Sequence, residues 1–138
     1  MRAVLFAINE TPMEIEYTGE LSQLQAAVDG LVECVQFRIE DYYFDAWVNE
    51  EGILRGLPRN EFISDLIGFA FQNKEFGIVG NVLITGQAVD GETRGLSDEE
   101  LETLRSMWNA HALAMHITGL IEEAVKHVPP APPMHTLN

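Results

Sequence analysis

The side chains that most often make or break bonds in proteins are few in this chain, and their spacing fits no common active site. His111 and His116 lie five residues apart, about 140° from each other on a helix, so they cannot share one metal ion as an i, i+4 pair could. Glu50 and Glu51 could coordinate Mg²⁺, but neighbours in sequence seldom point at one spot, and a solvated turn is the better reading. The serines lie in no Gly-x-Ser-x-Gly elbow, and no glycine-rich phosphate loop is present. We therefore expect no enzymatic activity, no bound metal and no cofactor.

The single cysteine, Cys34, excludes an internal disulfide bond and a cysteine-only metal site. It lies in an apolar run at 31–35 with no neighbouring Lys, Arg or His to stabilise a thiolate, so we expect a buried and unreactive thiol. No apolar stretch is long enough to cross a bilayer, and the amino end has no export signal. A cytoplasmic protein fits these features best.

The densest group of polar side chains falls in a turn-like segment, 49–60. There the Asn49 side chain can bond the backbone just ahead, Gly52 can take a positive φ, and Asn60 suits the start of a helix. One reading is a structural turn, and the other is a binding site for a ligand or partner on a rigid loop. The candidate binding residues, with a nearby Gly-Asn pair, are Asn49, Glu50, Glu51, Gly52, Arg55, Leu57, Pro58, Arg59, Asn60, Gly80 and Asn81.

The chain is strongly acidic, with 22 Asp and Glu against 8 Lys and Arg, a formal net charge of −14. The acids fall mainly in the segments 10–20, 33–51 and 90–102. Such a surface repels bare nucleic acid and anionic membranes, so we expect neither as a direct partner. Two readings remain open: the charge serves solubility alone, or ordered carboxylates imitate a phosphate backbone and occupy the basic groove of another protein.

Hydrophobic periodicity predicts an α+β domain with a mostly antiparallel or mixed sheet of about five strands and two to three helices. The strands are expected at 2–8, 13–17, 31–39, 42–48 and 76–85, with the first two and the next two forming hairpins. Helices are expected at 21–28, 59–72 and 101–127, and a polar loop at 87–95. The sequence Ser97-Asp98-Glu99-Glu100 is a capping box that marks the start of the last helix.

The last predicted helix, 101–127, is apolar on more than one face. Either it packs deep against the sheet, or one of its stripes belongs to a partner subunit in a homodimer. Thr118 and Gly119 could bend or interrupt it. A single domain over 1–127 is therefore predicted, followed by a proline-rich, flexible and extended tail at 128–138.

Four segments, at 21–35, 48–60, 78–86 and 96–99, together resemble an uncharacterised family of small acidic proteins carried by bacteriophages, conjugative elements and their bacterial hosts. The spacing from Asn-Glu-Glu-Gly to Leu-Pro-x-Asn is the most specific part, and the resemblance covers roughly residues 1–105. Asp29 stands where the family tends to have a second glycine, and the long helix and tail extend beyond the common core. The resemblance brings no activity with it and implies an accessory protein of a mobile element.

Charge, missing motifs and resemblance together favour a non-enzymatic interaction protein that binds a host or defence protein with a basic surface. A homodimer through the 101–127 helix is a further expectation. The alternative is a small-molecule or nucleotide-binding module that uses the 49–60 loop.

Overall fold

The computed structural model describes residues 1–130, and within them the chain forms a six-stranded antiparallel sheet and three helices. The strands are β1 (Arg2–Phe6), β2 (Met13–Glu16), β3 (Val32–Ile39), β4 (Tyr42–Asn49), β5 (Val82–Val89) and β6 (Glu92–Arg94). The helices are α1 (Leu21–Val28), α2 (Glu61–Ala70) and α3 (Asp98–Lys126). The predicted α+β class with a long C-terminal helix is confirmed.

The strand order is β2-β1-β5-β4-β3, and β6 pairs with the far end of β5. Both predicted hairpins form: β1 pairs with β2 from Arg2↔Glu16 to Leu5↔Met13, and β3 pairs with β4 along its whole length. The central strand β5 joins the two hairpins through antiparallel pairing with β1 and β4. Strands β2 and β3 are the two edges of the main sheet.

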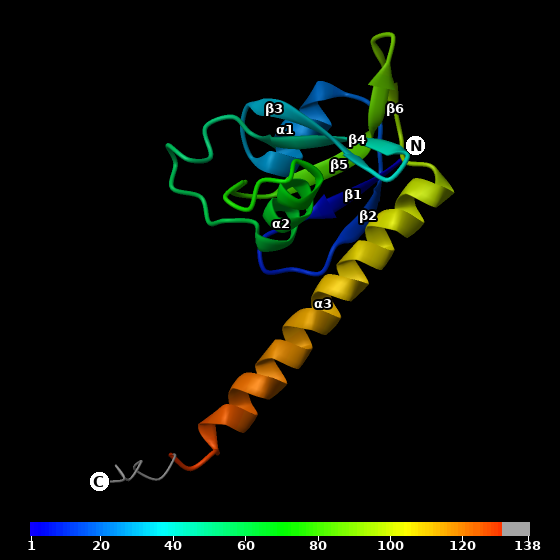
Figure 1. Cartoon of the computed structure of the whole chain (residues 1–138). Coiled ribbons are helices and arrows are strands. Elements are labelled where there is room, and N and C mark those ends of the chain that lie inside the picture. The colour runs from blue at the N-terminus through cyan, green and yellow to red at the C-terminus, as the bar shows by residue number, and fades with distance from the viewer. Residues whose placement is uncertain (131–138) are drawn as a thin grey trace, which may run out of the picture.

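Helices cover both faces of the sheet (Figure 1). On one face α2 and the start of α3 pack over alternate residues of the central strands, and Phe44, Ile63, Ile67 and Ile84 are fully buried there. On the other face α1 covers a smaller cluster that includes Tyr17, Leu24 and Leu83. Period-2 alternation in the strands explains the division, because successive side chains point to opposite faces.

The predicted strand at 76–85 is wrong in its first half, since β5 begins only at Val82. Gly80 has a φ of +79°, which turns the backbone out of the extended conformation, and Val79 makes only an isolated bridge with Arg59. The predicted loop at 87–95 is wrong as well, because β5 continues to Val89 and pairs with β6. Asp90 and Gly91 both have positive φ and close this hairpin, as an Asp-Gly pair often does.

The helix α3 starts as predicted, with the Ser97 hydroxyl accepting from the Glu100 backbone and the Glu100 carboxylate accepting from the Ser97 backbone. Its first turns bury Leu101 and Leu104, and His111 is its last half-buried residue.

Beyond His111, α3 leaves the globular part, and every residue from 112 to 130 is exposed (Figure 1). Deep packing of the whole helix against the sheet is therefore wrong. A break at Thr118 and Gly119 is wrong too, since the helix runs unbroken and the Thr118 hydroxyl donates to the Ala114 carbonyl at 2.9 Å. The predicted tail lies outside the described residues from 131 onward.

No helix of the described residues is both long and apolar enough to span a membrane.

Candidate interaction site

The loop between β4 and α2 is held at its first end by Asn49. This side chain is 6% exposed, and its amide donates to the carbonyls of Val28 and Asp29 at 3.0 and 3.2 Å. Its oxygen accepts from the Glu51 backbone at 2.8 Å, the local bond that the sequence predicted. All of these bonds go to main-chain atoms, so Asn49 ties the loop to the end of α1.

The other end of the loop is held by Asn60, also 6% exposed. Its amide donates to the carbonyls of Phe6 and Gly80, both at 3.0 Å, and its oxygen accepts from the backbone of Ile63 as the predicted helix cap. Asn60 therefore joins β1, the segment before β5 and the start of α2. Like Asn49, it uses its hydrogen-bonding groups inside the protein.

Two glycines allow the middle of the loop to pack closely on the segment before β5. A Cβ atom on Gly52 would lie 2.7 Å from a methyl of Val79, and one on Gly80 would lie 2.9 Å from a methyl of Leu57. The prediction of a positive φ at Gly52 is wrong, because Gly80 and Gly56 take that conformation and Gly52 does not. Gly52 is required by close packing instead.

Ion pairs complete the anchoring of the loop. Arg55 donates to the Asp29 carbonyl at 2.6 Å and lies 3.2 Å from its carboxylate. Asp29 has a φ of +58° at the end of α1, a left-handed position that suits glycine or a short polar residue. Arg59 pairs with Glu61 and Asp65 on α2, next to Pro58. These pairs are exposed, so they contribute modestly to stability and mainly fix the course of the chain.

The tip of this clamped loop is apolar and fully open to solvent. Ile53 is 81% exposed and Leu54 is 90% exposed, more than any other large apolar side chain among residues 1–130. We call these two residues, with Glu50 and Glu51 beside them, the loop tip. Sequence reasoning missed Ile53 and Leu54, although two large apolar residues inside a polar turn were a visible signal.

A shallow pocket of about 220 Å³ adjoins the loop tip. Its apolar floor comes from Val35, Val48 and Ile78, while Glu33 and Glu50 lie at its rim. An apolar side chain next to a cation suits such a pocket, because the floor offers apolar contact and the rim offers negative charge.

The structure thus brings the predicted site residues together around one loop, but it assigns most of them to the scaffold. Asn81, for example, accepts from the Ile8 backbone at 3.0 Å, and Leu57 packs on Gly80. Of the predicted set, Glu50 and Glu51 are exposed and make no ion pair with another described residue.

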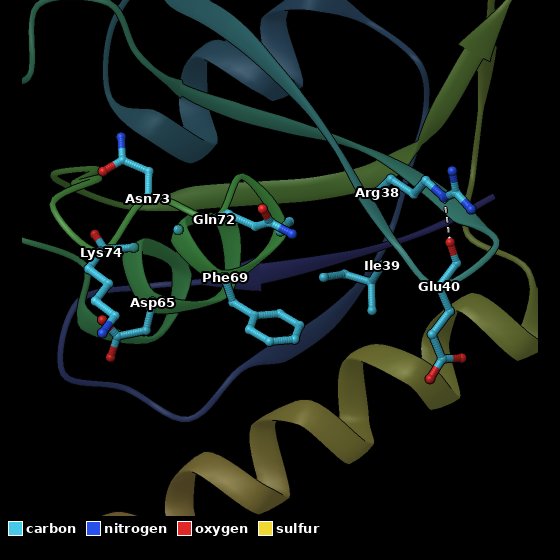
Figure 2. A pocket seen from close by; sticks show the side chains of 11 residues that line it. Arg38, Ile39, Glu40, Asp65, Phe69, Gln72, Asn73 and Lys74 are labelled. Carbon is cyan, nitrogen blue, oxygen red and sulfur yellow. Dashed lines mark hydrogen bonds between the residues drawn. The ribbon is translucent and has the colours of Figure 1, made fainter.

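A second hollow, of about 640 Å³, lies between α2 and the end of the β3–β4 hairpin (Figure 2). Phe69 extends toward this hollow opposite Ile39 and is 72% exposed. The rim carries charges of both signs, from Arg38, Glu40, Asp65 and Lys74. None of its lining residues was predicted as a site residue.

Carboxylates without an ion pair to another described residue occur on both edges of the sheet and in the β5–β6 hairpin. Glu14 lies on the edge strand β2, Glu33 lies on the opposite edge strand β3, and Asp90 and Glu92 lie in the β5–β6 hairpin. The loop tip differs from these other acidic places in degree. Met13 beside Glu14 and Val89 beside Asp90 are 54% and 57% exposed, whereas Ile53 and Leu54 are 81% and 90% exposed.

The face of the sheet under α1 holds a small group of ionisable side chains. Burial, and after it the Asp45 carboxylate, raise the pKa of the Cys34 thiol to about 12. Burial also raises the pKa of Tyr17, with Asp45 and Cys34 as additional causes. Asp45 is 2% exposed; one of its oxygens accepts from Ala88 at 3.1 Å, and the other has no partner among the described residues. Cys34 is half-buried and not fully buried as predicted, while its low reactivity stays a prediction that the raised pKa supports.

The globular part of the chain is the part that a known family shares. The chain belongs to a family described as Domain of unknown function (DUF3846), whose model matches residues 1–109. Comparison with curated proteins and comparison with solved structures found no match. The expected membership of an uncharacterised family is confirmed. The match ends close to His111, where α3 leaves the globular part, so the exposed helix lies beyond the matched region.

Proposed function

We propose that this protein is a non-enzymatic interaction protein that binds a protein partner with a basic surface through its loop tip. One observation carries the proposal: the two most exposed large apolar side chains among residues 1–130, Ile53 and Leu54, project from a loop whose ends are clamped by buried asparagines. An apolar side chain exposed to this degree contributes little to folding. Its burial by a partner would be favourable.

The clamped loop lowers the cost of binding. Ordering a flexible loop at an interface costs conformational entropy, and a loop that is already ordered avoids most of that cost. Apolar contacts at the tip would supply affinity. Glu33, Glu50 and Glu51 would favour partners with basic residues around an apolar pocket and would speed their association.

The resemblance noted in the sequence supports a phage or mobile-element origin and a host or defence protein in the cytoplasm as the partner. Imitation of nucleic-acid charge is one form that this binding could take. Carboxylates on opposite edges of the sheet give that form little support, whereas a local apolar tip with an acidic surround fits recognition of a protein surface.

Small-molecule or nucleotide binding by the same loop ranks second. Asn49 and Asn60 are the residues best suited to recognise a polar ligand, but their side-chain amides already donate to backbone carbonyls. A nucleotide would also meet the negative charges of Glu33 and Glu50 at the adjacent pocket.

The test is crosslinking and co-purification from host cells with three forms of the protein. Wild type should retain a partner that the double variant I53S/L54S loses. The variant F69S is the matched control, because Phe69 is 72% exposed on a different surface, and it should retain the same partner. Loss of the partner in F69S with retention in I53S/L54S would refute the assignment to the loop tip.

The negative charges of Glu50 and Glu51 should contribute measurably to the binding of the partner. The variant E50Q/E51Q should bind the captured partner more slowly, and its affinity should depend less steeply on salt than that of wild type. Competition by duplex DNA for the same partner would distinguish imitation of nucleic acid from recognition of an ordinary protein surface.

A further inference from the structure

The part of α3 beyond the globular domain carries an uncovered apolar stripe. Leu113, Ile117, Leu120 and Ile121 are between 46% and 59% exposed. With Ala124, the spacing Leu113, Ile117, Leu120, Ala124 follows the alternation of four and three residues that forms the seam of a coiled coil. We call these five residues the distal stripe.

The distal stripe lies on the side of the helix away from the domain. Leu104, which is 2% exposed and packs on the domain, precedes Leu113 by nine residues, or about two and a half helical turns. The two leucines therefore point in opposite directions. A helix from a second copy can therefore lie along the distal stripe without contacting the globular domain of the first copy.

The part of α3 that carries the distal stripe differs in charge from the globular domain. Between 109 and 126 the charged residues are Glu122, Glu123 and Lys126, a net charge of −1, and the segment 127–138 has no Asp, Glu, Lys or Arg. The remaining −13 belongs to residues 1–108. Two copies repel each other through their domains but not through this nearly neutral apolar helix.

We propose that the distal stripe binds a second copy of this chain, and that the two helices run antiparallel. An antiparallel pair places the acidic domains at opposite ends, whereas a parallel pair would hold two charges of −13 side by side. It also packs Ile117 against Leu120 of the partner subunit.

Polar side chains beside the seam favour the same direction. His116 and Glu123 occupy equivalent heptad positions on one flank of the distal stripe. In an antiparallel pair such positions face each other, so that Glu123 meets His116 of the partner subunit. In a parallel pair Glu123 would instead face Val128 of the partner subunit, an apolar residue.

Sedimentation equilibrium of the full chain tests the association, with L113D and M115D as a matched pair of variants. Leu113 and Met115 are both 59% exposed and only two residues apart, yet they point to nearly opposite sides of the helix. Wild type and M115D should be dimers, and L113D should dimerise at least roughly 100-fold more weakly, because each dimer loses two buried leucines. A monomeric wild type at high micromolar concentration, or equal weakening by both variants, would overturn the proposal.

Disulfide trapping tests the direction in a C34S background. A mixture of I117C and L120C chains should form the mixed disulfide in preference to either symmetric one, because these positions meet only in the antiparallel pair. Preferential self-crosslinking of L120C would show a parallel pair and would refute the antiparallel arrangement.

Discussion

Arg94 and Glu100 face each other as a two-pronged ion pair across the start of α3. The two terminal nitrogens of Arg94 lie 2.6 and 2.7 Å from the two carboxylate oxygens of Glu100. Glu100 is 3% exposed and also accepts from the Ser97 backbone, so one carboxylate joins β6 to the helix cap. Burial by itself raises the pKa of Glu100, but the bonds from Arg94 and Ser97 outweigh it and lower this pKa below its ordinary value.

The lowered pKa of Glu100 predicts a loss of stability in acid. Its contribution is complete above the ordinary value of 4.5 and is lost as the pH falls through the lower pKa of the folded state. The variant E100Q should be less stable by about 3 kcal/mol at neutral pH. Its free energy of unfolding should fall less between pH 4.5 and more acidic conditions. Urea titrations at a series of pH values measure both effects.

The neighbour Glu99 provides the control for this prediction. It is exposed and makes no ion pair with another described residue, so E99Q should change stability by less than about 1 kcal/mol and keep the acid response of wild type. Equal pH profiles for E100Q and wild type would show that the ion pair does not cause the acid response.

Gly80 is predicted to tolerate no side chain. Its φ is +79°, and a Cβ atom would approach Leu57 to 2.9 Å, so G80A should lower the free energy of unfolding by about 1–2 kcal/mol. The same substitution at Gly119 is the control. A Cβ atom there has no neighbour within 4 Å, and G119A should raise the helix content by circular dichroism. An unchanged melting temperature in G80A would contradict the close packing of Leu57.

The buried carboxylate of Asp45 is predicted to lower the free energy of unfolding of the protein. A carboxylate that is 2% exposed and leaves one oxygen unpaired among the described residues loses its hydration without full compensation. The variant D45N keeps an acceptor for the Ala88 backbone and removes the charge, so it should be more stable by about 1 kcal/mol in urea titrations. Destabilisation by D45N would mean that the second oxygen also accepts a bond in the folded protein.

Cys34 is predicted to react slowly with thiol reagents. Since burial and Asp45 raise its pKa to about 12, the thiolate is scarce at pH 8, and alkylation of the folded protein should be much slower than that of the urea-unfolded chain. Mass spectrometry after timed labelling measures both rates. Equal rates would place the thiol in open solvent.

The sequence allowed the prediction of those elements whose signals are local. The capping box at Ser97, the cap at Asn60 and the alternation in the β3–β4 hairpin each depend on a few neighbouring residues, and all were confirmed. The start of β5 could not be predicted in this way. The apolar run at 76–85 resembles a strand, and only long-range bonds from Asn60 to Gly80 and from Gly80 to Pro58 show why its first half departs from the sheet.

The 49–60 loop was predicted as a candidate site, but the contacts of its residues were not predicted. The polar residues of the 49–60 loop drew attention because polar side chains often bind ligands, yet the buried ones, Asn49 and Asn60, hold the backbone. Burial of these two residues depends on α1, β1 and α2, which no local pattern places against the loop. The exposure of Ile53 and Leu54 likewise follows from the path of the chain.

Because α3 continues unbroken past the domain, it acts as a spacer of defined length. The 15 residues from 112 to 126 extend about 22 Å at 1.5 Å per residue, so a group held near Lys126 keeps a set distance from the domain. The helix also sets a rotational phase, because insertion of one residue near Ala112 would turn everything beyond it by about 100°. Insertion of about a whole turn would therefore change mainly the length of the helix. Insertion of a fraction of a turn would change mainly the direction in which the side chains beyond it point.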